Sequence, residues 1–216
     1  PPTFGVAPDR VIALIAGGDA ALRRSIEGAE DDAAQAVTDI SEVNVSAKDL
    51  VVGITASGTT PYVIAALRAA TDRGAATALL CCNPAVAPAQ AGLIIALDTG
   101  PEALPGSTRL KAGTATKMAL NMISTGAMAL AGYVYQGIMT HMRPANAKLR
   151  RRAARIVATL ADISEQTAEV FLREGKWRIP VAVIMAVKGM DAGTAERLLA
   201  RAGGRLRDVL PSPPPE

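Results

Sequence analysis

LVVGITASGTTPYVIAALRAATDRGAATALLCC, residues 50–82, decides the fold class of this chain. It opens on an apolar run over residues 50–54, typical of a strand buried on both faces, and closes on a second such run over 77–82. Between them, residues 61–73 have helical spacing, with Thr60 as candidate N-cap and Pro61 in the first turn. Strand, helix and strand at this spacing predict a parallel, right-handed α/β unit.

Elements on both sides extend this unit. A third apolar run, residues 93–97, predicts another strand, while residues 11–31 and 31–42 have helical spacing. Gly17 and Gly18 interrupt the first of these two patterns. The long apolar pattern over residues 114–136 is rich in small residues and predicts a buried helix.

The composition changes near residue 150, where short helical patterns replace the strands. They cover residues 148–160, 164–174, 180–188 and 192–201, and Gly203-Gly204 precedes a last turn. We therefore expect an α/β domain over residues 1–147 and a small all-α subdomain over 148–210. The sequence PSPPPE, residues 211–216, predicts a flexible tail.

Charge and size limit the partners of the chain. Its 216 residues can bury one good core, and its net charge of +3 is too small to indicate nucleic acid. The densest basic run, from Lys148 to Arg155, is typical of a solvated helix face, with an interaction surface as the alternative. No run reaches the roughly 18 apolar residues of a membrane span, so we expect no membrane partner.

Cysteine and histidine usage gives no sign of a metal site. Cys81 and Cys82 are adjacent, and neighbouring cysteines rarely form a disulfide, so free thiols in a reducing cytoplasm are expected. His141 is the only histidine, and we expect it to be structural. We therefore expect no metal site.

Two stretches have the composition of a binding site. TASGTT, residues 55–60, lies between a predicted strand and a helix N-terminus, where backbone N–H groups and the helix dipole attract an anion. Residues 100–121 alternate glycines and hydroxyls with two cations, Arg109 and Lys111. Small residues let a backbone approach a ligand closely. Together these patterns predict a site for an anionic, polyhydroxylated ligand.

The second stretch also resembles the signature of the N-acetylmuramic acid 6-phosphate etherases and their relative, the glucokinase regulatory protein. The matching segments are GPE at 100–102, GSTR at 106–109, Lys111 and GTA at 113–115. Other segments similar to the etherases are PPTFG at 1–5, IAGG at 15–18, EGAEDD at 27–32, ASGTTPYV at 56–63 and CNP at 82–84. The resemblance implies the sugar isomerase (SIS) fold: a three-layer α/β/α domain with a parallel sheet and a helical C-terminal part.

The resemblance also implies roles for individual residues. It assigns Ser57, Gly58 and Thr59 to the sugar phosphate, although N-capping accounts for Thr60. Ser107 and Thr108 would contact the phosphate or the N-acetyl group. Arg109 or Lys111 would bind the lactyl carboxylate, with a bridge between subunits as the alternative for Arg109. Glu102 would contact sugar hydroxyls, or else cap a helix or brace a loop.

The implied activity is a lyase reaction that needs no metal or redox cofactor. By match to EGAEDD, Glu30 is one of two catalytic carboxylates, and we expect it to be the base; taken alone, this acidic cluster is typical of a solvated face. The family's other carboxylate, like its first strand, stands before PPTFG. We therefore expect an N-terminally incomplete chain with weak activity alone. A cytoplasmic homodimer with its seam on residues 114–136 is expected. The alternatives are a non-catalytic sugar-phosphate-binding regulator and a sugar-phosphate isomerase.

Overall fold

A computed structural model describes residues 3–85 and 91–210. These residues form two compact units, which we describe separately. The first, called the sheet unit, contains the described residues between Ala13 and Met122. The second, called the helical unit, contains those up to Ile12 and from Ile123 onward. The expected domain boundaries, 1–147 and 148–210, stay predictions, and the expected tail at 211–216 lies outside the described residues.

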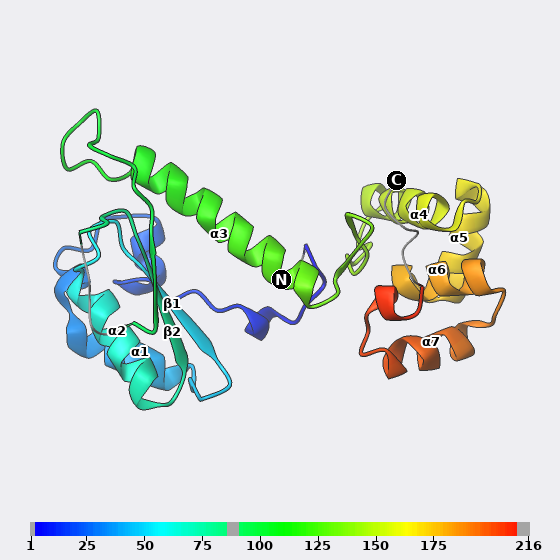
Figure 1. The fold of residues 1–216 in the computed structure, drawn as a ribbon, viewed down its shortest axis with the longest axis horizontal. Helices are drawn as coiled ribbons and strands as arrows, with labels where there is room; N and C mark the ends of the chain where they lie inside the picture. Colours follow the sequence, from blue (N-terminus) through cyan, green and yellow to red (C-terminus); the bar gives the residue numbers. More distant parts are fainter. Residues whose placement is uncertain (1–2, 86–90, 211–216) are drawn as a thin grey trace. The chain divides into compact units, whose positions relative to one another are not determined.

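The sheet unit is built on three parallel strands. They are β1 (Leu50–Ile54), β2 (Ala76–Cys81) and β3 (Leu93–Ala96), in the order β1-β2-β3. Leu50 lies opposite Ala76, and Ala78 lies opposite Leu93. The parallel pairing of β1 and β2 is visible in Figure 1. All three predicted strands are confirmed to within one residue.

Helices cover this sheet where a glycine permits close approach. α2 (Pro61–Asp72) lies against β1 and β2, and α1 (Ala33–Glu42) packs on α2. A Cβ atom on Gly53 of β1 would lie only 2.7 Å from Val63 Cγ1 and 2.9 Å from Leu67 Cδ1. Leu67 and Leu79 are fully buried at this contact. A side chain at position 53 would therefore push α2 away from the sheet.

The helix expected over residues 11–31 is absent from the structure. Three short 3₁₀ turns stand in this region: η1 (Pro8–Arg10), η2 (Gly18–Leu22) and η3 (Ala29–Asp31). Gly17 and Gly28 precede η2 and η3 with φ of +83° and +74°, a left-handed conformation that interrupts an α-helix. Regular α-helix begins only at Ala33, where the Asp32 carboxylate accepts a hydrogen bond of 2.8 Å from Gln35 N–H.

The prediction of a buried helix over residues 114–136 is wrong in extent and in burial. α3 spans Lys111–Leu130, and only Ala112 and Ala119 in it are buried. Its Met118 and Met122 side chains are 57% and 65% exposed. The chain leaves the helix at Gly132, whose φ is +92°, and forms a short antiparallel pair, β4 (Val134–Tyr135) and β5 (Ile138–Met139). Small side chains bury little apolar area, so the pattern alone did not ensure burial.

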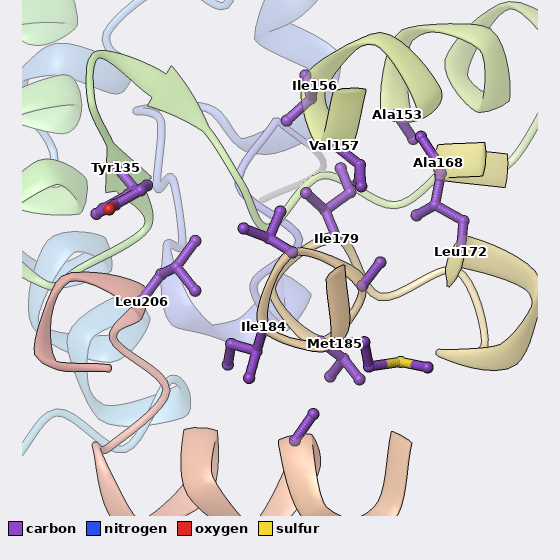
Figure 2. Packing of buried hydrophobic residues seen from close by; sticks show 14 of the residues in the cluster. Tyr135, Ala153, Ile156, Val157, Ala168, Leu172, Ile179, Ile184, Met185 and Leu206 are labelled. Carbon is purple, nitrogen blue, oxygen red and sulfur yellow. The ribbon is translucent and has the colours of Figure 1, made fainter. Parts of the chain in front are cut away.

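The helical unit contains the four helices expected from the sequence. They are α4 (Ala147–Ala161), α5 (Glu165–Glu174), α6 (Ile179–Lys188) and α7 (Ala192–Arg201), followed by the turn η4 (Leu206–Asp208). α6 packs against the other three, and its first seven residues are all buried. Figure 2 shows Ile179, Ile184 and Met185 of α6 within this core.

Together the two units confirm the expected class: a mixed α/β chain with a parallel sheet and a helical C-terminal part. Side-chain caps fix three of the helix starts in the helical unit, because Asn146, Ser164 and Asp191 each accept a hydrogen bond from an N–H group in the first turn. Within the ranges that the structure describes, no helix is long and apolar enough to cross a membrane.

Candidate functional site

The parallel sheet brings the predicted binding stretches to one edge. Parallel strands all end at the same edge of a sheet, and ligands of open α/β sheets bind outside these carboxyl ends. Residues 55–60 follow β1, residues 82–85 follow β2, and residues 97–110 follow β3. The substrate-binding residues predicted from sequence lie in the first and third of these segments and at the start of α3. The sheet unit therefore carries all of them, as it does Glu30.

The loop after β1 is closed by its own hydroxyl groups. Ser57 Oγ accepts hydrogen bonds from the N–H of Thr59 (3.2 Å) and from its hydroxyl (3.1 Å). Thr55 Oγ1 lies 3.3 Å from Ser57 Oγ. Gly58 has φ of +79°, which allows the chain to turn back between Ser57 and Thr59. The loop thus places hydroxyl groups beside the N-terminal end of α2, where an anion is stabilised.

Thr60 stands at the N-cap position of α2, as expected, but its side chain makes no capping bond. Its hydroxyl lies instead 2.7 Å from Thr55 Oγ1. Pro61 at the first helical position has no N–H group, so α2 has one fewer donor to satisfy. Thr55 is 8% exposed, and the sequence analysis did not single it out. Its position directly after an apolar strand was the sequence signal that could have identified Thr55 as part of the loop's hydrogen-bond network.

Glu102 caps α3 with both of its carboxylate oxygens. Its Oε2 accepts a hydrogen bond of 3.1 Å from Lys111 N–H, and its Oε1 accepts one of 2.9 Å from Ala112 N–H. The hydrogen bond from Ala112 is the main cause that lowers the pKa of Glu102 below its ordinary value, so the carboxylate is ionised at neutral pH. Of the roles expected for Glu102, this geometry supports helix capping. Contact with sugar hydroxyls stays a prediction.

Cys82 connects the first loop to the start of α3. Its N–H donates a 3.0 Å hydrogen bond to Ala56 O in the loop after β1. Its Sγ lies 3.6 Å from both Ala112 O and Thr116 Oγ1 in α3. Both cysteines are free thiols, as expected. The bridging position of Cys82 has no local sequence signal, because its α3 partners lie 30 and 34 residues further along the chain.

Glu30 reaches this region through η3, which packs against α2. Its side chain is exposed, and its carboxylate has no hydrogen-bond partner among residues 3–85 and 91–210. The predicted role of Glu30 as a base therefore meets no competing hydrogen bond in the described part of the chain. The catalytic role of Glu30 stays a prediction.

The remaining predicted residues frame the start of α3. Thr108 O accepts a 2.9 Å hydrogen bond from Gly113 N–H, and Ser107 N–H donates one of 3.0 Å to Leu104 O. The side chains of Arg109 and Lys111 are exposed and form none of the ion pairs found in the described part of the chain. That part also holds no group of three or more His, Cys, Asp or Glu residues suited to a metal ion.

Known proteins match this chain over most of its length. Residues 5–71 match the family model described as the glucokinase regulatory protein N-terminal SIS domain. Two N-acetylmuramic acid 6-phosphate etherases, from Yersinia pestis (strain Pestoides F) and Yersinia pseudotuberculosis (serotype O:1b, strain IP 31758), are each 48% identical to this chain over 211 residues. Each match covers 97% of this chain and 72% of the relative.

Proposed function

This chain belongs to the N-acetylmuramic acid 6-phosphate etherase family, and from that membership we propose that it is a carbon–oxygen lyase acting on this amino-sugar phosphate. It cleaves the D-lactyl ether of N-acetylmuramic acid 6-phosphate to give N-acetylglucosamine 6-phosphate and D-lactate. One observation carries the proposal: 48% identity over 97% of the chain, a span that includes both site loops and Glu30.

The proposed chemistry is β-elimination followed by addition of water. In the open-chain aldehyde, the C2 proton is acidic because it is α to the C1 carbonyl. Glu30 removes this proton, the C3–O bond breaks, and a C2=C3 double bond forms. The lactate oxygen takes a proton from a second acid. Water then adds at C3 and a proton returns to C2, so the net reaction consumes one water.

The loop after β1 supports the phosphate contact. We assign the phosphate to Ser57, Gly58 and Thr59, whose hydroxyl and backbone groups lie at the N-terminal end of α2. The lactyl carboxylate is assigned to Arg109 or Lys111, both of which are exposed cations near the start of α3.

Further residues at the start of α3 complete the proposed contacts. Ser107 and Thr108 are assigned to the phosphate or the N-acetyl group. Glu102 is assigned to sugar hydroxyls in addition to its capping bonds, because each carboxylate oxygen accepts more than one hydrogen bond.

The setting of the enzyme is part of the same proposal. Free thiols at Cys81 and Cys82 suit a reducing cytoplasm, where the reaction would serve the recycling of peptidoglycan amino sugars. The exposed Met118 and Met122 on α3 support a homodimer with this helix at its seam.

A non-catalytic regulator is the alternative, favoured by the match of residues 5–71 to the glucokinase regulatory protein model. The two functions differ in one product. An etherase releases D-lactate from N-acetylmuramic acid 6-phosphate, whereas a regulator binds sugar phosphates and releases none.

The deciding experiment measures D-lactate release by the chain and by a form that also carries the residues that the longer relatives have outside the match. We expect release by the longer form, and its loss in Glu30→Gln but not in Asp31→Asn, a matched change on the next residue. Sugar-phosphate binding without lactate release by either form would support the regulator. Unchanged release in Glu30→Gln would remove Glu30 from the mechanism.

A further inference from the structure

The helical unit contains a cavity that the proposed reaction does not use. Its lining comes from the segment after β5, from the turn between α5 and α6, and from Gly5. The polar and aromatic groups in this lining are Thr140, His141, Arg143, Lys176, Trp177 and Arg178. No aspartate or glutamate is among the lining residues.

Positive charge dominates this cavity. Arg143, Lys176 and Arg178 are exposed cations in its lining, and Arg178 is paired at 3.1 Å with one carboxylate, that of Glu196. Three cations less this carboxylate leave two net positive charges. That excess matches a phosphate group, which carries about −1.5 to −2 charges at pH 7.

The N-terminal end of α6 adds to the same potential. Ile179 and Pro180, the first two residues of this ten-residue helix, line the cavity. Arg178 stands at the N-cap without a side-chain capping bond. The positive end of the helix dipole therefore adds to the potential of the cavity, and no acidic residue stands in the first turn of α6.

Trp177, which lines the cavity, is held in place by neighbouring groups. Lys176 and Trp177 have φ of +52° and +60°, and Trp177 N–H donates a 2.6 Å hydrogen bond to Leu172 O, which fixes the turn. The guanidinium of Arg150 lies 4.9 Å from the centroid of the Trp177 ring. Arg150 belongs to the basic run of α4, which holds five cations and no acidic residue. This run thus contacts Trp177, a residue of the cavity lining, through Arg150.

We propose that this cavity is a second binding site, distinct from the etherase site, for a phosphate dianion that is free or esterified to a small molecule. Arg143 supplies a planar fork that binds two phosphate oxygens, Arg178 donates through the guanidinium N–H groups not bonded to Glu196, and Lys176 supplies a point charge. A small ligand fits better than a nucleic acid, because the net charge of the chain is only +3.

The sequence provides two clean reporters for this site. Trp177 is the only tryptophan and His141 the only histidine of the chain, and both line the cavity. Inorganic phosphate and N-acetylglucosamine 6-phosphate are titrated separately, at constant ionic strength, against the full chain. Trp177 fluorescence and the His141 imidazole NMR signals are followed. We expect a saturable change in both, and the tighter of the two probes identifies the source of the phosphate.

Variants assign that signal to the cavity. Arg143→Gln combined with Arg178→Gln is expected to weaken phosphate binding at least tenfold. Lys176→Asn removes a single point charge and is expected to weaken binding less. Asparagine is chosen because it tolerates the left-handed backbone at position 176. Arg173→Gln on α5 removes the same charge from the same unit and should leave binding unchanged. Ser57→Ala, in the sheet unit, should leave the Trp177 and His141 responses unchanged, which distinguishes this site from the proposed substrate site. Circular dichroism checks that each variant is folded, and Lys176→Asn serves if the double variant is not.

Three outcomes would overturn the proposal. The first is an unsaturable response, or one that chloride reproduces at equal ionic strength. The second is a folded double variant that binds as tightly as the unmodified chain. The third is binding of heparin or single-stranded RNA without binding of either small phosphate, which would identify the basic surface as a polyanion site.

Discussion

The hydroxyl of Tyr62 donates a hydrogen bond to the carboxylate of Asp39, and this bond joins α2 to α1. Tyr62 follows the loop that holds Ser57 and Thr59, while Asp39 lies on the helix that follows Glu30. Tyr62 is only 5% exposed, and its burial, together with the Asp39 carboxylate, raises the pKa of the hydroxyl well above its usual range. The hydroxyl therefore stays protonated and can act as the donor.

Tyr62→Phe removes this donor from a partly buried pair. We expect the free energy of unfolding to fall by about 1–3 kcal/mol, as measured by urea denaturation, because a charge-assisted hydrogen bond is lost. Asp39→Asn, which leaves a weaker neutral acceptor, should cost less. Equal stability of Tyr62→Phe and the unmodified chain would show that the pair contributes nothing.

Gly53→Ala tests the close approach of α2 to the sheet. The added methyl group would meet Val63 and Leu67 at under 3 Å, so one or both must move. We expect a loss of about 1–3 kcal/mol in the free energy of unfolding. Gly126→Ala on α3 is the control, because an added Cβ there meets no atom within 4 Å. A Gly53→Ala chain as stable as the control would contradict this packing.

The capping of α3 by Glu102 predicts a dependence of stability on acid pH. The pKa of Glu102 is lowered in the folded chain, mainly by the hydrogen bond from Ala112, so the unfolded chain binds its proton first as pH falls. The contribution of ionised Glu102 to the stability of the folded chain is present above the ordinary pKa of 4.5 and is lost as pH falls through the lowered pKa of the folded chain. The stability difference between the chain and Glu102→Gln should therefore shrink from about pH 5 to about pH 3. A constant difference would exclude this role.

His141 predicts a second dependence, at higher pH. Its pKa is lowered, first by burial and further by the charge of Arg178, so the folded chain favours the neutral imidazole. Protonation favours the unfolded chain, and stability is lost as pH falls from the ordinary value of 6.5 through the folded pKa. Urea denaturation between about pH 7.5 and about pH 5 should show this slope, and His141→Gln should lack it. The same slope in both chains would assign it to other groups.

The strand–helix–strand pattern of residues 50–82 predicted the fold well because each element has its own local signal. Apolar runs marked the strands, and Pro61 marked the start of α2. The region before α1 was predicted less well, since glycines with left-handed backbone divided it into short turns. The prediction that α3 is buried was wrong for another reason. Periodicity describes one face of a helix, whereas burial depends on what packs against that face.

The site was predictable where the resemblance covered it and not where contacts join distant segments. TASGTT and residues 100–111 were both identified, and the parallel sheet explains why they lie at one edge. The bridging contacts of Cys82 to Ala56 and Thr116 were missed, because both partners stand far from it along the chain. The same limit applies to Tyr62 and Asp39, which are 23 residues apart.

Proton exchange at C2 tests the central claim most directly. The longer form of the chain is incubated with N-acetylmuramic acid 6-phosphate in D₂O, and the N-acetylglucosamine 6-phosphate formed is examined by NMR. β-Elimination with Glu30 as base predicts deuterium at C2 in step with D-lactate release, and loss of both in Glu30→Gln. Lactate release without deuterium at C2, or unchanged exchange in Glu30→Gln, would contradict the account.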